Sequence, residues 1–322
     1  MRILVTGGAG FIGSNYVHHL LAHTDDSVTV LDALTYAGCR RTLEDLDDDP
    51  RFTFVHGDIC DRETVLSAMA GHDAVVHFAA ESHVDRSLLD PDVFVRTNCM
   101  GTNVLCDVAL RVGIQRFVHI STDEVYGSIE EGSFAETDPL APRSPYSAAK
   151  AGSDLIALAY HETHALPVLV TRSSNQFGPH QFPEKLIPFF VTNLLDGQQV
   201  PLYGDGMNIR DWLFVRDNCA GVDLVLRRGE VGEIYNIGGG NERTNRDITD
   251  RLLGMLDRDE DSVTYVEDRL GHDRRYSITS EKIRSLGWSP EVDFEDALAE
   301  TVAFYRDNRD WWEPLKSRVR NR

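Results

Sequence analysis

The chain has 322 residues, of which 42% are hydrophobic, a composition ordinary for a folded protein with a substantial core. Its formal net charge of −20 leaves no basic footprint for nucleic acid, and no run of about 18 apolar residues predicts a membrane span. We therefore expect neither nucleic acid nor a membrane as a partner, and we interpret the acid excess as a solubilising surface.

The cysteines and the first residues bear on the compartment. Five cysteines are scattered along the chain without a CxxC pair, namely Cys39, Cys60, Cys99, Cys106 and Cys219. This usage predicts reduced thiols, with neither a disulfide framework nor a zinc site. The strand-like stretch RILVTG begins at residue 2 and leaves no room for a signal peptide. We expect a cytoplasmic protein without a metal.

The first half of the chain alternates strand and helix patterns. Short apolar runs rich in Val, Ile and Phe occur in the order RILVTG, SVTVLD, FTFVHGD, AVVHFAA, RFVHIS and LPVLVTR. Segments of helical length separate them, and this order predicts a parallel sheet covered on both faces. We expect an α/β, Rossmann-type doubly wound domain over residues 1–172.

After residue 172 the pattern changes. Prolines become frequent, and PLYGDGMNIRDWLFV (201–215) predicts a hairpin around its Gly-Asp-Gly turn. Helical patterns follow in NRDITDRLLGMLD (245–257) and FEDALAETVAFYRDNRDWW (294–312). We expect a smaller, mixed α/β substrate domain over residues 173–322, with some later segments returning to the large sheet.

The turn after the first strand, TGGAGFIGS, has the spacing of a dinucleotide site. Its glycines include Gly7, Gly10 and Gly13, which let the backbone approach a pyrophosphate at the start of the next helix. Asp32 ends the second strand, where a carboxylate accepts the adenine-ribose hydroxyls and repels a 2′-phosphate. This favours NAD over NADP, although Arg40 and Arg41 could soften the preference.

Two further patterns carry chemistry. Tyr146 and Lys150 are spaced i, i+4 at the start of a helix, so that both side chains share one face. An ammonium beside a phenol favours phenolate, which makes the tyrosine a usable base near neutral pH. The stretch STDEVYG ends a strand and places Asp123 and Glu124 directly behind Thr122. Two adjacent carboxyls in a closed site split their pKa values, so that one serves as acid and one as base.

In this order, over nearly the whole chain, these motifs resemble the extended short-chain dehydrogenase/reductase family. Within that family, six segments look like the dTDP-glucose 4,6-dehydratases: STDEVYG, FAAESHVDRS, YSAAKAGSD, FPEKLIP, YGDGMNIRDW and GHDRRY. The resemblance implies NAD as cofactor, dTDP-glucose as substrate and a homodimer.

The resemblance also implies a reaction. Oxidation of C4 by NAD+ makes the C5 proton of the sugar acidic, and Tyr146 would take the 4-hydroxyl proton in that step while Thr122 binds the 4-oxygen. Glu124 would then remove the C5 proton, and a protonated Asp123 would help the C6 hydroxyl leave. Hydride return to C6 would give the 4-keto-6-deoxy sugar.

Two sets of binding residues are implied by the same resemblance. The cofactor set consists of Gly7, Gly10, Phe11, Ile12, Gly13, Asp32, Thr35, Asp58, Ile59, Ala80, Thr97, Tyr146 and Lys150. The substrate set consists of Ser82, Asn175, Lys185, Leu186, Pro201, Tyr203, Arg210, Asn245, Arg269, His272 and Asp273. Arginine forks suit the diphosphate, and Tyr203 would flank the base.

Other functions compete with this one. A different nucleotide-sugar 4,6-dehydratase, a C4-oxidising epimerase or a decarboxylase shares most of the motifs, and a non-catalytic NAD-binding regulator shares the glycine turn. An epimerase or a decarboxylase has no use for Asp123 beside Glu124, and a regulator does not need these carboxyls together with Tyr146. The physical argument does not separate thymine from uracil.

The chain departs from the family pattern at several positions outside the catalytic residues. TYAG is followed by Cys39 where the family usually has Asn, and SNQFGP has Gln176 and Phe177 where the family usually has Asn and Tyr. Leu270 and Thr279 stand where the family commonly has Pro and Asp. Segments 93–112 and 148–163 are helical in pattern and apolar beyond one face, which predicts a four-helix interface between two copies.

Overall fold

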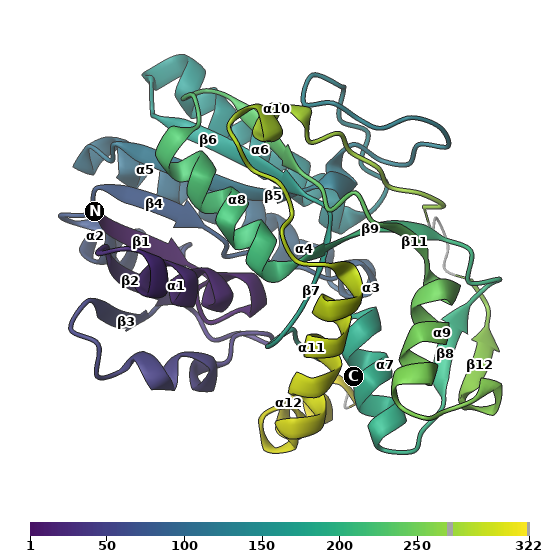
Figure 1. The fold of residues 1–322 in the computed structure, drawn as a ribbon. Helices are drawn as coiled ribbons and strands as arrows, with labels where there is room; N and C mark the ends of the chain where they lie inside the picture. The colour runs from purple at the N-terminus through teal and green to yellow at the C-terminus, as the bar shows by residue number, and fades with distance from the viewer. Residues whose placement is uncertain (269–272, 321–322) are drawn as a thin grey trace.

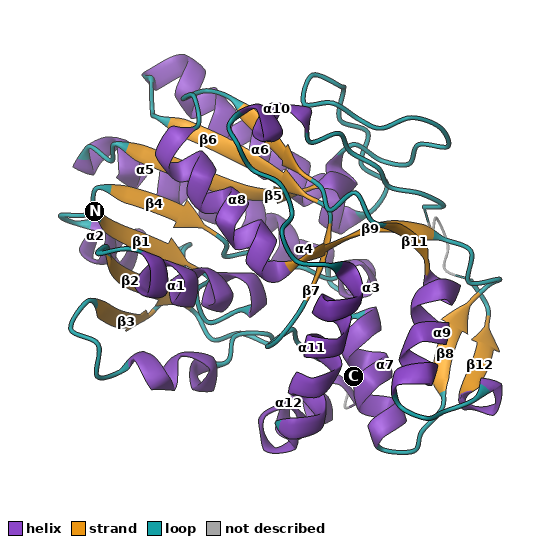
Figure 2. Cartoon of the chain, in the orientation of Figure 1, coloured by secondary structure: helices purple, strands orange, loops and turns teal. Residues whose placement is uncertain are grey.

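The computed structural model describes residues 1–268 and 273–320. Seven parallel strands form the large sheet, in the spatial order β10-β6-β5-β4-β1-β2-β3 (Figure 2). Their bounds are β1 Arg2–Thr6, β2 Ser27–Asp32, β3 Phe52–His56, β4 Ala74–His77, β5 Arg116–Thr122, β6 Val168–Ser173 and β10 Ile234–Ile237. The six strands predicted in the first half all form, and the α/β, Rossmann-type doubly wound fold is confirmed.

Helices cover both faces of this sheet because each strand buries side chains on both sides. Ile3 and Val5 of β1 point into one apolar cluster, while Leu4 between them points into another. Helices α1 (Phe11–His23) and α8 (Val215–Arg228) cover the first face (Figure 1). The second face packs against α2 Arg62–Met69, α5 Thr102–Val112 and α6 Pro145–His164.

The residues before and within its first turn set the start of helix α6. Ser144 and Ser147 form a reciprocal capping box, and Pro145 occupies the first turn. The expected helix over 93–112 is divided instead. It runs as α4 (Pro91–Phe94), a π-helical stretch, η2 (Val95–Gly101), and α5. A π-helical turn inside a helix often marks a functional site.

Most of the remaining elements gather beside the carboxyl ends of the large sheet, whereas α10 packs against its edge strand β10 (Figure 1). A three-stranded sheet joins β7 Asn175–Phe177, β9 Ile209–Phe214 and β11 Glu242–Thr244, and a two-stranded sheet joins β8 Val200–Tyr203 and β12 Val263–Val266. The helices are α3 Val84–Leu89, α7 Leu186–Leu195, α9 Asn245–Met255, α10 Glu281–Ser285, α11 Phe294–Asp307 and α12 Arg309–Arg320; short 3-10 turns are η1 Arg40–Leu46, η3 Asp123–Val125 and η4 Glu260–Ser262.

The hairpin predicted around Gly204-Asp205-Gly206 is wrong. Both glycines do adopt positive φ angles, 56° and 72°, so the chain turns there. The two flanking strands then diverge into different sheets: β8 pairs in parallel with β12, and β9 pairs with β7 and β11. Partners distant in sequence therefore outcompete the local pairing that the turn suggested.

Some segments beyond residue 172 belong to the large sheet. Strand β10 pairs with β6, and α8 packs across the same face as α1. Residue 173 is the last residue of β6. Among the described helices, none has the length and apolar character needed to span a membrane.

Candidate active site

A large cavity of about 900 Å³ opens at the carboxyl ends of the sheet strands. Ligands of open parallel sheets bind at this edge. All the predicted catalytic and cofactor residues line this cavity, together with the nine predicted substrate residues that the structure describes. Arg269 and His272 lie outside the described residues, as does the departure at Leu270.

The glycine turn is shaped for close approach. Gly7 has a φ of 72°, and a Cβ there would lie 2.5 Å from the backbone nitrogen of Ala79. A Cβ on Gly13 would lie 2.3 Å from the carbonyl oxygen of Gly7. Gly10 precedes α1, and no described side chain caps that helix. The first-turn amides therefore remain as donors beside the cavity, which fits a pyrophosphate.

Asp32 is held at the end of β2 by two backbone amides. Its Oδ2 accepts from Ala9 N at 2.9 Å, and its Oδ1 accepts from Leu34 N at 2.8 Å. Burial raises the pKa of this carboxyl, and the two amide bonds oppose that effect. The remaining lone pairs fit ribose hydroxyls, so the turn and Asp32 together fit a nicotinamide dinucleotide.

The neighbouring charged residues are engaged elsewhere. Arg40 pairs with Asp47, and Arg41 donates to the carbonyl oxygen of Asp310 at 2.8 Å. Neither guanidinium therefore offsets Asp32 in this arrangement. Asp58 lines the cavity while accepting from Arg96 Nη2 at 2.8 Å.

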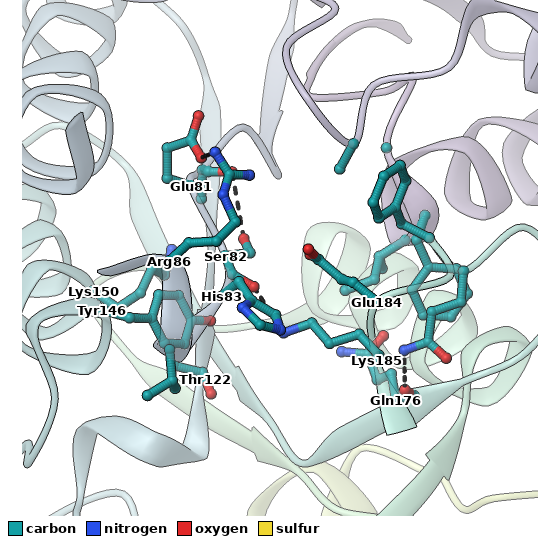
Figure 3. Close-up of a pocket in the computed structure, with 18 of the residues that line it drawn as sticks. Glu81, Ser82, His83, Arg86, Thr122, Tyr146, Lys150, Gln176, Glu184 and Lys185 are labelled. Carbon is teal, nitrogen blue, oxygen red and sulfur yellow. Dashed lines mark hydrogen bonds and ion pairs between the residues drawn. The ribbon is translucent and has the colours of Figure 1, made fainter. Parts of the chain in front are cut away.

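Tyr146 and Lys150 lie one helical turn apart on α6, and both line the cavity (Figure 3); Lys150 is buried and Tyr146 is half-buried. Lys150 Nζ donates to the carbonyl oxygen of Ile120 at 2.6 Å. Burial lowers the pKa of Lys150 to about 8. We expected this ammonium to lower the pKa of Tyr146, but the structure differs. Burial first, and then the charge of Glu124, raise the pKa of Tyr146, while a hydrogen bond with Thr122 lowers it.

The acid pair forms the turn η3, directly after β5. Thr122 caps this turn: its hydroxyl accepts from Glu124 N at 3.2 Å and donates to Asp123 Oδ1 at 3.2 Å. The Oδ2 atom of Asp123 is buried and has no hydrogen-bond partner among the described residues. Burial raises the pKa of Asp123 well above its usual range, and the charges of Glu124 and Asp211 raise it further. The arrangement thus provides a protonated carboxyl beside a second one.

The substrate end is built around Arg210 on β9. Its guanidinium donates to the carbonyl oxygen of Asp273 at 3.0 Å and lies 4.3 Å from the centre of the Tyr276 ring. Tyr276 in turn donates to Asp273 Oδ2 at 2.7 Å. Lys185 lines the same cavity, and its Nζ donates to the carbonyl oxygen of Ser82 at 2.8 Å. Two cations in the lining of one cavity suit a diphosphate.

The sequence analysis missed a charged and aromatic cluster in the lining of the cavity. The Arg86 guanidinium lies 3.2 Å from the centre of the Tyr36 ring and 3.4 Å from Glu81, and Tyr36 hydrogen-bonds Glu184. Figure 3 shows Glu184 and Lys185 across the cavity from Tyr146. The four residues of this cluster lie in segments that carry the family resemblance or its departures, namely FAAESHVDRS, FPEKLIP and TYAG. The sequence therefore contained the signal, but the motifs did not assign a role to each residue.

Two of the departures have a structural outcome. Phe177 is buried against the rings of Trp212, Phe214 and Phe294. This aromatic core accommodates a phenylalanine in place of the tyrosine that the family usually has. Gln176 lines the cavity, and its backbone carbonyl oxygen accepts from Gln181 Nε2 at 2.9 Å. Nothing in the structure explains Cys39 or Thr279.

Comparison with known proteins agrees with this geometry. Residues 4–301 match the model of the GDP-mannose 4,6 dehydratase family. A dTDP-glucose 4,6-dehydratase of Streptomyces antibioticus is 60% identical over 99% of this chain and 96% of the relative. A low-salt glycan biosynthesis protein, Agl12, of Haloferax volcanii is 55% identical over 95% of this chain and 98% of its own.

A solved structure gives the same relationship in three dimensions. DesIV, a dTDP-glucose 4,6-dehydratase of Streptomyces venezuelae crystallised with NAD, superposes with a TM-score of 0.96. It is 58% identical, and the match covers 98% of this chain and all of DesIV. With identity of this degree over both whole chains and the acid pair in place, the chain belongs to the dTDP-glucose 4,6-dehydratases of the extended short-chain dehydrogenase/reductase family.

Proposed function

We propose that the chain converts dTDP-glucose to dTDP-4-keto-6-deoxyglucose with loss of water, using NAD. The observation that carries this proposal is the acid pair: a buried Asp123 with a raised pKa beside Glu124, in the cavity that holds Tyr146 and Lys150. Removing water across C5 and C6 requires an acid and a base at those carbons at once, whereas epimerisation at C4 requires no such pair at C5 and C6. Relatives named dTDP-glucose 4,6-dehydratase support the same substrate.

The glycine turn and Asp32 would hold NAD, with Thr97, Tyr146 and Lys150 along the same wall. Bound NAD supplies the acceptor and later the donor of one hydride, together with a positive charge at the nicotinamide. Tyr146 accepts the proton of the sugar 4-hydroxyl. Tyr146 must therefore be the phenolate before this transfer and the neutral phenol after it; Lys150 would stabilise that phenolate, and Thr122 would keep the 4-oxygen within its reach.

Elimination falls to the carboxyls. Once C4 is a ketone, Glu124 removes the acidified C5 proton, and Asp123 delivers its own proton to the departing 6-hydroxyl. A neutral Asp123 is what its burial and the nearby charges of Glu124 and Asp211 favour. When hydride returns to C6, Glu124 gives its proton back to C5. The proton that Tyr146 took from the 4-hydroxyl replaces, by transfer within the site or through solvent, the one that Asp123 lost to water, so the site ends each cycle as it began.

A division of labour along the chain follows. Residues 1–172 would bind NAD, and residues 173–322 would bind the nucleotide sugar through Arg210, Lys185 and Tyr203. Because the hydride leaves and returns within one cycle, the reduced cofactor has no reason to leave the cavity. The enzyme would therefore form no net NADH.

Assembly and compartment are part of the proposal. Large apolar side chains are exposed on η2, α5 and α6, among them Val95, Met100, Leu110 and Leu155. A second copy that covers them would make the predicted four-helix interface of a homodimer. All five cysteines are free, which supports work in the reducing cytoplasm.

The experiment is a single incubation with dTDP-glucose, followed by alkali and measurement of the absorbance of a 4-keto sugar. We expect product without added reductant and without NADH in the filtrate. UDP-glucose in a parallel reaction reports the choice of base. Recovery of a C4 epimer, or NADH released in proportion to turnover, would favour an epimerase or a simple dehydrogenase instead.

A further inference from the structure

A chain of buried polar groups lies behind the Tyr146–Lys150 face of α6, outside the cavity. Asp154 is on α6, one turn after Lys150, and its Oδ2 accepts from Arg172 Nε of β6 at 3.0 Å. His119 Nε2 of β5 lies 3.2 Å from Asp154 Oδ1. All three side chains are essentially inaccessible to solvent. Ionised groups are seldom buried this deeply without a role in structure or function.

Arg172 connects this cluster to the turn that carries the acid pair. Its Nη1 donates to the Tyr126 hydroxyl at 2.8 Å, and its guanidinium lies 4.8 Å from the centre of the same ring. The Tyr126 hydroxyl donates onward to Asn236 Oδ1 at 2.9 Å. Tyr126 follows Glu124 by two residues, in STDEVYG. One guanidinium thus joins the helix of Tyr146 and Lys150 to the turn of Asp123 and Glu124.

The negative charge of Asp154 also interacts electrostatically with the Lys150 ammonium. The titratable groups around Lys150 are Tyr146 and Asp154 on α6, His77 on β4, Cys99 on η2 and His119 on β5, with the Arg172 cation on β6 behind them. Burial and the neighbouring Lys150 ammonium lower the pKa values of both histidines, which keeps them neutral. Burial lowers the pKa of Lys150 to about 8, and Asp154 is the leading group that opposes this change.

We propose that Asp154 is a positioning residue that, through Arg172 and Tyr126, fixes the acid-pair turn against α6 and keeps the buried ammonium of Lys150 charged. This inference rests on the proposed function only in assigning Lys150 to the catalytic machinery. Asp154 itself touches neither the cavity nor the predicted substrate residues among the described contacts.

The direct test is the titration of Lys150 by NMR. The chain has four lysines, Lys150, Lys185, Lys282 and Lys316, so protein labelled with ¹³C at lysine Cε gives four signals. A Lys150→Arg sample assigns the relevant one. We expect its midpoint near the pKa of about 8 in the unsubstituted chain, and lower by roughly 1 pH unit in Asp154→Asn. An unchanged midpoint would overturn the electrostatic part of the proposal.

Asp154→Asn leaves the Arg172 charge buried without an anion, which endangers folding. The double variant Asp154→Asn/Arg172→Met removes both charges and should still lower the midpoint, because Asp154 acts on Lys150 more strongly than Arg172. Asp154→Glu should restore most of the Lys150 midpoint. A double variant with a wild-type midpoint would contradict the proposal.

Asp26→Asn is the matched control. Asp26 is a buried aspartate that pairs with Arg227 at 2.7 Å, far from Lys150. It should lower stability and leave the Lys150 midpoint unchanged. In turnover assays, the alkaline limb of the rate against pH should move to lower pH in Asp154→Asn and stay in place in Asp26→Asn. Loss of rate without that movement would indicate a purely structural residue. If unsubstituted protein does not turn over dTDP-glucose, the proposed function fails, while the NMR result still decides the role of Asp154.

Discussion

Replacing Asp123 by asparagine removes one transferable proton while preserving the shape of the side chain. Asp123 Oδ1 accepts from Thr122, and an asparagine amide oxygen keeps that bond. Tyr146, Lys150 and the glycine turn are unchanged. A positioned proton donor contributes about 10²–10⁴-fold in rate, which corresponds to about 2.7–5.4 kcal/mol in the barrier for elimination. We therefore expect Asp123→Asn to oxidise C4 normally and to eliminate water slowly.

The assay is a single turnover in D₂O, with absorbance at the reduced-nicotinamide band and mass spectrometry of the sugar. Asp123→Asn should accumulate NADH and 4-keto-glucose transiently, and C5 hydrogen should still exchange with solvent because Glu124 remains. Glu124→Gln, the matched control, should accumulate the same species without that exchange. Normal elimination in both variants would mean that the acid pair is not the elimination machinery.

The same substitution carries a stability prediction. Burial and nearby charge raise the pKa of Asp123 in the folded state, so the folded protein holds this proton at pH values where the unfolded chain has released it. Such a group does not lower the free energy of unfolding below the unfolded pKa of about 3.9. Once pH exceeds the folded pKa, it lowers the free energy of unfolding by about 1.4 kcal/mol for each pH unit by which the folded pKa exceeds the unfolded one. Asp123→Asn should therefore gain stability over the unsubstituted chain as pH rises from 5 to 8. Denaturant unfolding across that range measures it, and a gain that shrinks with rising pH would contradict the assignment.

Other predictions concern the cofactor, the first redox step, the interface and the charge. Tyr146→Phe should stop before C4 oxidation, so single turnover shows little NADH. Asp32→Ala should weaken NAD binding roughly 10-fold or more, through two lost backbone contacts and the ribose acceptor, as isothermal titration would show. Leu155→Arg should give monomers in light scattering, where a dimer of unchanged size would argue against the proposed helix interface. The protein has a net charge of −20, so its thermal unfolding midpoint should rise with salt concentration as salt screens the repulsion between acidic residues. A midpoint that does not change with salt would indicate that these residues are already paired.

Local spacing was enough to predict much of this protein. The i, i+4 separation of Tyr146 and Lys150 fixes them on one helix face whatever surrounds the helix, and the glycine turn has few ways to connect β1 to α1. Each strand of the first half buries both of its faces, so its apolar run is visible without knowledge of its neighbours. The fold class and the cavity wall of Asp32, Tyr146 and Lys150 follow from such short-range rules.

Long-range packing decided the rest. The Gly204-Asp205-Gly206 turn suggested a hairpin, yet β8 found its partner in β12, some sixty residues later, because pairing energy depends on which edges the fold brings together. The pKa of Asp123 is raised partly by Asp211, and the pKa of Tyr146 is raised by burial that no spacing rule reports. Arg172 and Asp154 are 18 residues apart and meet Tyr126 only when β6, α6 and η3 pack together. Burial and electrostatic coupling are properties of the assembled core, and they became visible only in the tertiary structure.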